Sequence, residues 1–181
     1  YLANVGMRWM ISGIARALKP GCKADQWLIL EGGQGKKKST GLEALSPHKD
    51  WFQDQLPDVG KNVKDAKIAL FGNWIIEIAE LEAIRKADQE AVKKFASLHT
   101  DKERLPYDRR PSTLPRRCIF AGTHNPKNDE GYLTDPTGNR RFLPVEVGPV
   151  DVLAIETDRD QLWAEAKSLF NQGERWWTEP T

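Results

Sequence analysis

Short runs of consecutive apolar residues alternate along the chain with stretches in which apolar residues recur every three or four positions. Such runs are typical of strands buried on both faces, and the longer period is typical of amphipathic helices. The runs predict strands at 26–31, 74–79, 117–123 and 142–147, with a shorter one at 51–52. The periodic stretches predict helices at 2–18, 38–45, 81–98 and 158–171, and one or two helical turns at 65–70.

The order of these elements predicts the fold class. Strands that alternate with helices favour a three-layer α/β domain with a mostly parallel central sheet. Pro144 lacks a backbone N–H donor, which favours an edge position for the strand at 142–147. The 181 residues are enough for one domain with a substantial core. We expect this single domain to be a fragment of a longer protein, with an N-terminal helix at 1–20, a core at 21–147 and a C-terminal helical segment at 148–181.

A glycine-rich loop joins the strand at 26–31 to the helix at 38–45. Proteins hold nucleoside triphosphate phosphates in this arrangement, because the backbone N–H groups of the loop and the helix N-terminus attract anions. In the usual pattern a lysine reaches the outer phosphates and the next hydroxyl binds Mg²⁺, which are roles that fit Lys38 and Ser39. The predicted nucleotide-binding residues are Gly32, Gly33, Gln34, Gly35, Lys36, Lys37, Lys38, Ser39 and Thr40.

One position of this loop departs from the usual pattern of glycine, four residues, glycine, lysine, and serine or threonine. Gly32, Lys38 and Ser39 match the pattern, but Lys37 occupies the second glycine position. A side chain at that position must point away from a phosphate that normally approaches bare backbone. The alternative is a solvated turn, and the flanking strand and helix favour the phosphate site over it.

Polar residues lie at the ends of two further strands, where a phosphate-binding loop needs partners. Glu77 lies within the strand at 74–79 and Glu80 at its end, and either carboxylate is suited to hold Mg²⁺ or to act on the hydrolytic water. Asn125 follows the strand at 117–123 and is suited to orient that water or to contact the γ-phosphate. The alternatives are a salt-bridged strand residue for Glu77, a helix N-terminal acid for Glu80 and a turn former for Asn125.

Two groups of basic residues suggest contacts beyond a nucleotide. Arg140 and Arg141 come just before the strand at 142–147 and are placed to project from the domain, unless they form a solvated pair. Residues 93–117 carry eight lysines and arginines against three carboxylates, an excess of five positive charges in a chain whose net charge is +1. Such an excess suits single-stranded DNA, and the alternative is a solvated surface hairpin. The predicted DNA-binding residues are Lys93, Lys94, Lys102, Arg104 and Tyr107, the last by stacking on a base.

Composition argues against several other classes of protein. The two cysteines are far apart, which argues against a disulfide scaffold or a cysteine zinc site and fits an intracellular protein. The three histidines show no metal-ligand spacing. No apolar run approaches the length of about 18 residues that a membrane span needs, so we expect no membrane partner.

The order of the motifs resembles the virulence-associated E family over residues 20–177. The segments that carry the resemblance are LEGGQGKKKST, DWFQDQLP, WIIEIAEL, KKFASLHTDKERLPY, CIFAGTHN and GNRRFLPV. Members of this family are P-loop ATPases of phages and pathogenicity islands, related to superfamily 3 helicases and to the AAA+ class. The resemblance implies ATP and Mg²⁺ as cofactors and a homo-oligomeric, hexameric ring that acts in mobile-element DNA replication. It also implies the cytoplasm of a bacterial or phage-infected cell, and in the full-length protein a possible primase domain.

The resemblance also implies roles for single residues. Lys38 and Ser39 take the Walker A roles, Glu77 and Glu80 take Walker B-like roles, and Asn125 is the sensor asparagine. Either Arg140 or Arg141 is the arginine finger. Lys37 departs from the glycine of the family's loop.

The sequence therefore predicts an ATP-hydrolysing, helicase-type DNA motor domain. The first rival is a non-catalytic module that binds nucleotide, DNA or a partner protein, with hydrolysis lost through Lys37. The second rival, a small-molecule kinase with a P-loop, gives no role to Asn125 or to the basic segment.

Overall fold

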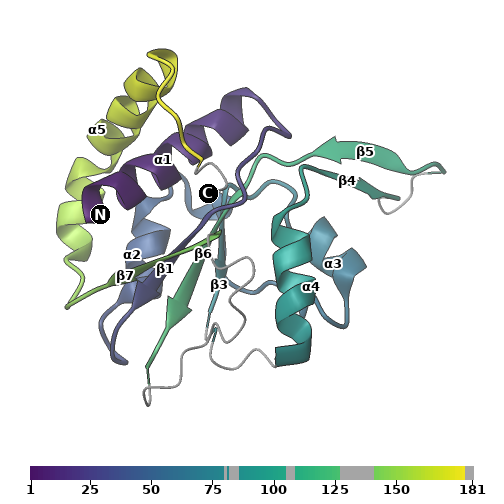
Figure 1. The fold of residues 1–181 in the computed structure, drawn as a ribbon, viewed down its shortest axis with the longest axis horizontal. Helices are drawn as coiled ribbons and strands as arrows, with labels where there is room; N and C mark the ends of the chain where they lie inside the picture. Colours follow the sequence, from purple (N-terminus) through teal and green to yellow (C-terminus); the bar gives the residue numbers. More distant parts are fainter. Residues whose placement is uncertain (80, 82–85, 105–108, 127–140, 178–181) are drawn as a thin grey trace.

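A parallel sheet forms the centre of the computed structural model, which describes all residues except 80, 82–85, 105–108, 127–140 and 178–181 (Figure 1). Within the described residues this sheet has five strands in the order β2-β3-β6-β1-β7, with every neighbouring pair parallel. The strands are β1 (Trp27–Glu31), β2 (Phe52–Gln53), β3 (Ile75–Ile78), β6 (Ile119–His124) and β7 (Phe142–Glu146). The predicted α/β class and mostly parallel sheet are confirmed, and β7 with its Pro144 lies at an edge.

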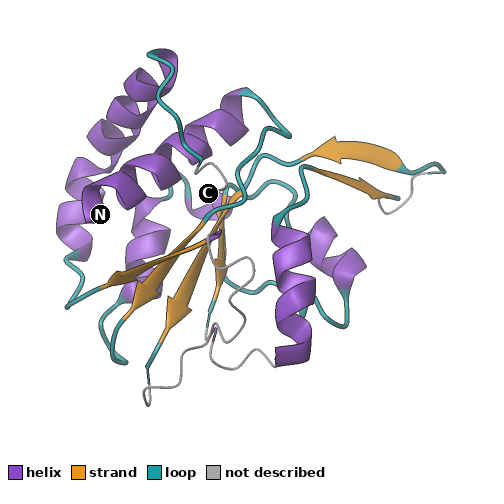
Figure 2. Cartoon of the chain, in the orientation of Figure 1, coloured by secondary structure: helices purple, strands orange, loops and turns teal. Residues whose placement is uncertain are grey.

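Helices cover both faces of this sheet, which makes the fold compatible with three layers (Figure 2). One face carries α1 (Leu2–Leu18), α2 (Lys38–Leu45) and α5 (Val152–Asn171), and the other carries α3 (Val63–Ile68) and α4 (Lys86–Ala96). Alternate strand residues serve the two faces: Ile75 packs in the cluster with α1 and α5, and Ile76 packs in the cluster with α3 and α4. Both faces are therefore apolar, which explains the continuous apolar runs.

Several element boundaries differ from the sequence-based prediction. Helix α5 begins at Val152, six residues before the predicted start at 158, and the predicted start was wrong. Asp151 caps this helix, because its side chain accepts a hydrogen bond of 3.0 Å from the backbone N–H of Ala154. Helix α3 (Val63–Ile68) begins two residues before the helical turns predicted at 65–70, and a 3₁₀ turn (Lys49–Trp51) comes just before β2.

The chain between α4 and β6 forms a hairpin that extends away from the central sheet (Figure 1). Its strands β4 (Thr100–Glu103) and β5 (Ser112–Pro115) pair antiparallel, with Asp101 opposite Leu114 and Lys102 opposite Thr113. Asp101 is buried and Lys102 is exposed, so one face of the hairpin turns inward and the other faces solvent. The charged segment, for which the sequence analysis named a surface hairpin as the alternative to a DNA contact, therefore does contain a two-stranded hairpin.

Candidate functional site

The glycine loop follows β1 at the edge of the sheet where the parallel strands end. The N–H of Gly32 donates to the carbonyl oxygen of His124, at the end of the neighbouring β6, over 3.1 Å. A Cβ atom on Gly32 would lie 2.7 Å from the carbonyl oxygen of Val147, so only glycine fits there without a backbone shift. A second backbone hydrogen bond anchors the loop, because Val150 N–H donates to the carbonyl oxygen of Lys36 over 3.0 Å.

Lys37 has a left-handed backbone conformation, which glycine adopts more readily than other residues do. Its φ of 59° and ψ of 33° are left-handed, and it is the one non-glycine residue with positive φ in the described part of the chain. Such a conformation costs an ordinary residue about 1–2 kcal/mol. The loop therefore keeps the backbone path expected of a glycine at this position, and the exposed Lys37 side chain leaves that path unobstructed.

Lys38 links the loop to the end of β6. Its ammonium group donates to the carbonyl oxygens of Gly32 and Gly33 over 2.6 and 3.0 Å, and to Asn125 Oδ1 over 2.7 Å. The side chain is buried beneath the loop. Two residues predicted for one site from segments 87 positions apart are thus in direct contact.

Ser39 links the start of α2 to β3. Its hydroxyl donates to Glu77 Oε1 over 2.7 Å, and the hydroxyl of Thr123 on β6 donates to the same oxygen over 2.9 Å. Glu77 is fully buried, and its other oxygen, Oε2, has no hydrogen-bond partner among the described residues. Glu77 pairs with Ala121 in the sheet, which places Thr123 two residues further along β6 on the same face.

The surroundings of Glu77 shift its pKa. Burial raises the pKa of this carboxyl group above its ordinary value, and the hydrogen bonds from Ser39 and Thr123 oppose that shift. The charge of Asp54 raises the pKa further, and the charge of Lys38 lowers it. A cation beside Glu77 would compensate the buried charge.

Thr123 and Asp54 were missed by the sequence-based prediction. Thr123 lies in an apolar run, where its hydroxyl gave no signal. Asp54 directly follows β2, and its position after a strand was the signal that could have found it.

The oxygens beside Lys38 fit Mg²⁺. Glu77 and Ser39 supply a carboxylate and a hydroxyl, which are hard oxygen ligands, and Glu77 Oε2 is left unsatisfied. No group of three or more His, Cys, Asp and Glu side chains suited to a metal occurs in the described residues. Mg²⁺ is usually held by one or two carboxylates together with water and substrate phosphates, and Glu77 supplies one such carboxylate.

Of the other predicted catalytic residues, Arg141 is the one that the structure describes. Glu80 and Arg140 lie outside the described residues, as does Tyr107 of the predicted DNA-binding set. Arg141 does not project freely as expected: its Nε lies 3.4 Å from Asp25 Oδ2 and its side chain is 24% exposed.

The predicted DNA-binding residues fall into two environments. Lys94, Lys102 and Arg104 are exposed. Lys93 is buried on α4, and its Nζ lies 3.3 Å from Glu90 Oε1, so this lysine does not present its charge to solvent.

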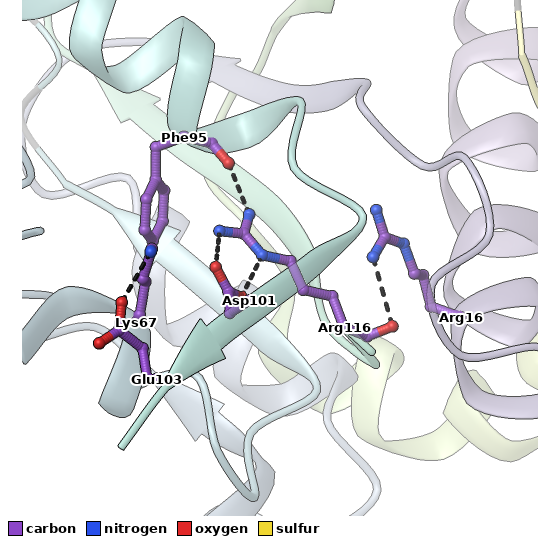
Figure 3. A network of polar contacts seen from close by, with 6 residues as sticks. All are labelled: Arg16, Lys67, Phe95, Asp101, Glu103 and Arg116. Atoms are coloured by element: carbon purple, nitrogen blue, oxygen red, sulfur yellow. Dashed lines mark hydrogen bonds and ion pairs between the residues drawn. The ribbon is translucent and has the colours of Figure 1, made fainter. Parts of the chain in front are cut away.

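The hairpin's inward face is fixed by ion pairs (Figure 3). Arg116 makes two hydrogen bonds to Asp101, of 2.6 and 2.9 Å, and donates to the carbonyl oxygen of Phe95 over 2.6 Å. Lys67 of α3 lies 2.7 Å from Glu103.

Fold and site together define an α/β protein in which a glycine-rich loop, Lys38 and Glu77 lie together at the carboxyl edge of a parallel sheet. Over residues 1–181 the chain matches the model of the virulence-associated protein E-like domain, and it belongs to that family. No curated protein sequence matches it. In the described part of the chain, no helix has the length and apolar character that crossing a membrane requires.

Solved structures of the NrS-1 C-terminal region share the fold. The A form of that region without ligand aligns with a TM-score of 0.60 at 15% identity, over 91% of this chain and 43% of the other. A second structure of the region without ligand aligns with a TM-score of 0.54 at 16% identity, over 88% of this chain and 40% of the other. This chain thus spans less than half the length of these relatives.

Proposed function

We propose that this domain binds and hydrolyses ATP with Mg²⁺ and acts as a helicase-type motor on single-stranded DNA during phage or mobile-element replication. One observation carries the proposal. Lys38 and Ser39, consecutive at the start of α2, reach Asn125 beyond β6 and Glu77 on β3 respectively. A cation, a hydroxyl, a carboxylate and an amide thus converge beside backbone N–H groups, as triphosphate hydrolysis requires.

Each residue of the cluster has a role in this proposal. The loop backbone holds the phosphates, and Lys38 exchanges its carbonyl partners Gly32 and Gly33 for the outer phosphate oxygens. Ser39 and Glu77 would hold Mg²⁺, which neutralises phosphate charge when bound. Asn125 positions the attacking water, and Glu80 remains a candidate to polarise it.

The arginine finger belongs to a neighbouring subunit in this proposal. Phe142 pairs with Trp27 at the start of β1, so Arg141 precedes β7 at the edge of the sheet opposite the glycine loop. Five residues of strand at roughly 3.3 Å each separate the two edges by about 16 Å, too far for an arginine there to serve its own site. Because Asp25 engages Arg141, we assign the finger to Arg140.

The family and the basic hairpin support the DNA role. The resemblance to mobile-element ATPases points to replication, and exposed Lys102 and Arg104 suit a phosphate backbone. A module that binds without hydrolysis is the rival, since Lys37 departs from the usual loop.

Nucleotide binding is tested by thermal unfolding with and without Mg-ATP. At 100 times its dissociation constant a ligand stabilises the folded protein by about 2.7 kcal/mol. We expect Lys38→Ala to lose most of that stabilisation, because it removes the contact to the outer phosphates. Lys37→Gly removes the same charge and is the matched control, which should enlarge the stabilisation because glycine restores the usual loop pattern. If Mg-ATP stabilises neither the wild-type chain nor the control, the loop is not a nucleotide site.

A further inference from the structure

A cavity of about 580 Å³ lies under the base of the hairpin, away from the glycine loop. Its lining includes Trp74, just before β3, and Cys118, just before β6, so it opens at the amino edge of the parallel sheet. The end of α3 and residues 114–118 close its other sides. The site at the carboxyl edge uses none of these residues.

Aromatic rings line the cavity and are accessible. Trp51 is 45% exposed and Phe71 is 39% exposed, although both are large apolar side chains. Trp51 meets Trp74 edge to face, with ring centroids 6.4 Å apart. Trp74 is fixed in turn, because its indole N–H donates to the carbonyl oxygen of Gly13 over 3.0 Å. The cavity thus has one fixed aromatic ring, that of Trp74, and two exposed rings, those of Trp51 and Phe71.

The exposed charge in the lining of the cavity is positive. Arg117 is the exposed one among the charged residues that line it, and the exposed Lys102, Arg104, Arg109 and Arg110 lie further along the hairpin, outside the cavity lining. The two described carboxylates of the hairpin do not offset these charges, because Asp101 is paired with Arg116 and Glu103 with Lys67 (Figure 3). An anionic occupant therefore complements this region of the surface.

We propose that this cavity binds a nucleobase of single-stranded DNA, with Trp51 and Phe71 stacking on bases and Arg117 contacting a phosphate. Aromatic stacking beside a cationic surface is how proteins hold single strands without sequence preference. An apolar peptide suits the rings but leaves the exposed guanidinium of Arg117 without a partner of opposite charge, which is why we favour the nucleic acid. The inference rests on the proposed action on DNA and adds a second contact region to the exposed hairpin face.

The test measures binding of a fluorescent oligothymidylate to the full chain at low salt by anisotropy. We expect Trp51→Ala and Phe71→Ala to weaken binding about 5-fold to 150-fold each, the range for loss of one stacked base. Trp51→Phe keeps a ring and should retain most of the affinity. Leu153→Ala, which truncates an exposed apolar residue on α5, is the matched control and should bind as the wild type does.

Photo-crosslinking locates the contact directly. An oligonucleotide carrying 5-iododeoxyuridine should give an adduct at Trp51, Phe71 or Trp74. Unchanged affinity in both alanine variants, or adducts only outside the cavity, would overturn the proposal. If Lys102→Ala with Arg104→Ala weakens binding but Trp51→Ala does not, DNA uses the hairpin face alone and an apolar partner becomes the better occupant.

The same variants separate this inference from the proposed ATPase. Trp51→Ala should leave ATP turnover without DNA unchanged, because Trp51 lies away from the glycine loop. ATP turnover that persists in Lys38→Ala would contradict hydrolysis at the glycine loop but would not affect the proposal for the cavity. Missing adducts would contradict DNA binding in the cavity but would not affect the proposal for the loop.

Discussion

At the scale of single residues, Lys37 keeps a left-handed conformation that costs about 1–2 kcal/mol, and the loop retains its path. The sequence showed that a glycine was missing from the pattern but not whether the backbone had changed with it. The structure separates these possibilities, because Lys37 is exposed while Lys38 and Ser39 still reach their partners. The substitution therefore strains the loop without dismantling it.

Replacing Lys37 by glycine should stabilise the protein. Glycine removes the left-handed penalty but loses more backbone entropy on folding, so we expect a net gain of about 0.5–1 kcal/mol in the free energy of unfolding. Lys37→Ala removes the same charge but keeps the strained conformation, and it should show no gain. Urea denaturation of the two variants measures the difference, and equal stabilities would mean that the conformation of Lys37 carries no strain. The glycine variant should also bind Mg-ATP more tightly than the wild type.

At the scale of elements, the sequence predicted the strands that carry the site to within a residue or two, because each is buried on both faces and reads as an apolar run. It also predicted that Lys38, Ser39, Glu77 and Asn125 share one edge, since parallel strands end together. Thr123 was missed because its contact with Glu77 depends on the register between β3 and β6. The pairing of Arg116 with Asp101 was missed for a similar reason, since it requires knowing how the hairpin folds back.

We predict that the buried ion pair between Asp101 and Arg116 anchors the hairpin to the domain. Asp101→Ala should destabilise the domain by about 3–5 kcal/mol, because it leaves Arg116 buried without its charge partner. Glu103→Ala is the control, since its ion pair with Lys67 is more exposed than the pair of Asp101 with Arg116 and its loss should cost less. Chemical denaturation measures both. Similar losses in the two variants would mean that the buried pair does not anchor the hairpin.

At the scale of the whole molecule, the two edges of the sheet carry different candidate sites. The carboxyl edge carries the glycine loop, while Arg141 at the start of β7 and the aromatic cavity lie at the amino edge. In the proposed function, the loop of one subunit would therefore receive its arginine finger from a neighbouring subunit. Head-to-tail contacts between subunits form rings when their rotation closes, and we propose such a ring for this domain.

Mixing two inactive variants tests the shared site. Lys38→Ala is expected to lose nucleotide binding and Arg140→Ala to lose the finger, so each alone should hydrolyse almost no ATP. In mixed oligomers some interfaces join an intact loop to an intact arginine, and activity should partly return. Each variant alone at the same total concentration is the control. If mixed oligomers form and stay inactive, the finger does not act between subunits.

The most direct test of the account is Mg²⁺-dependent ATP turnover by the assembled wild-type chain, beside Lys38→Ala and Lys37→Gly. The account predicts turnover in the wild type that single-stranded DNA stimulates, since the proposed motor couples the two ligands. It predicts a loss of about 100-fold or more in Lys38→Ala, the scale for removing one preorganised charge contact at a reacting group. Lys37→Gly removes the same charge and should be at least as active as the wild type. Turnover that is equal in the wild type and in Lys38→Ala, or absent from both the wild type and Lys37→Gly, would contradict an ATPase built on this loop.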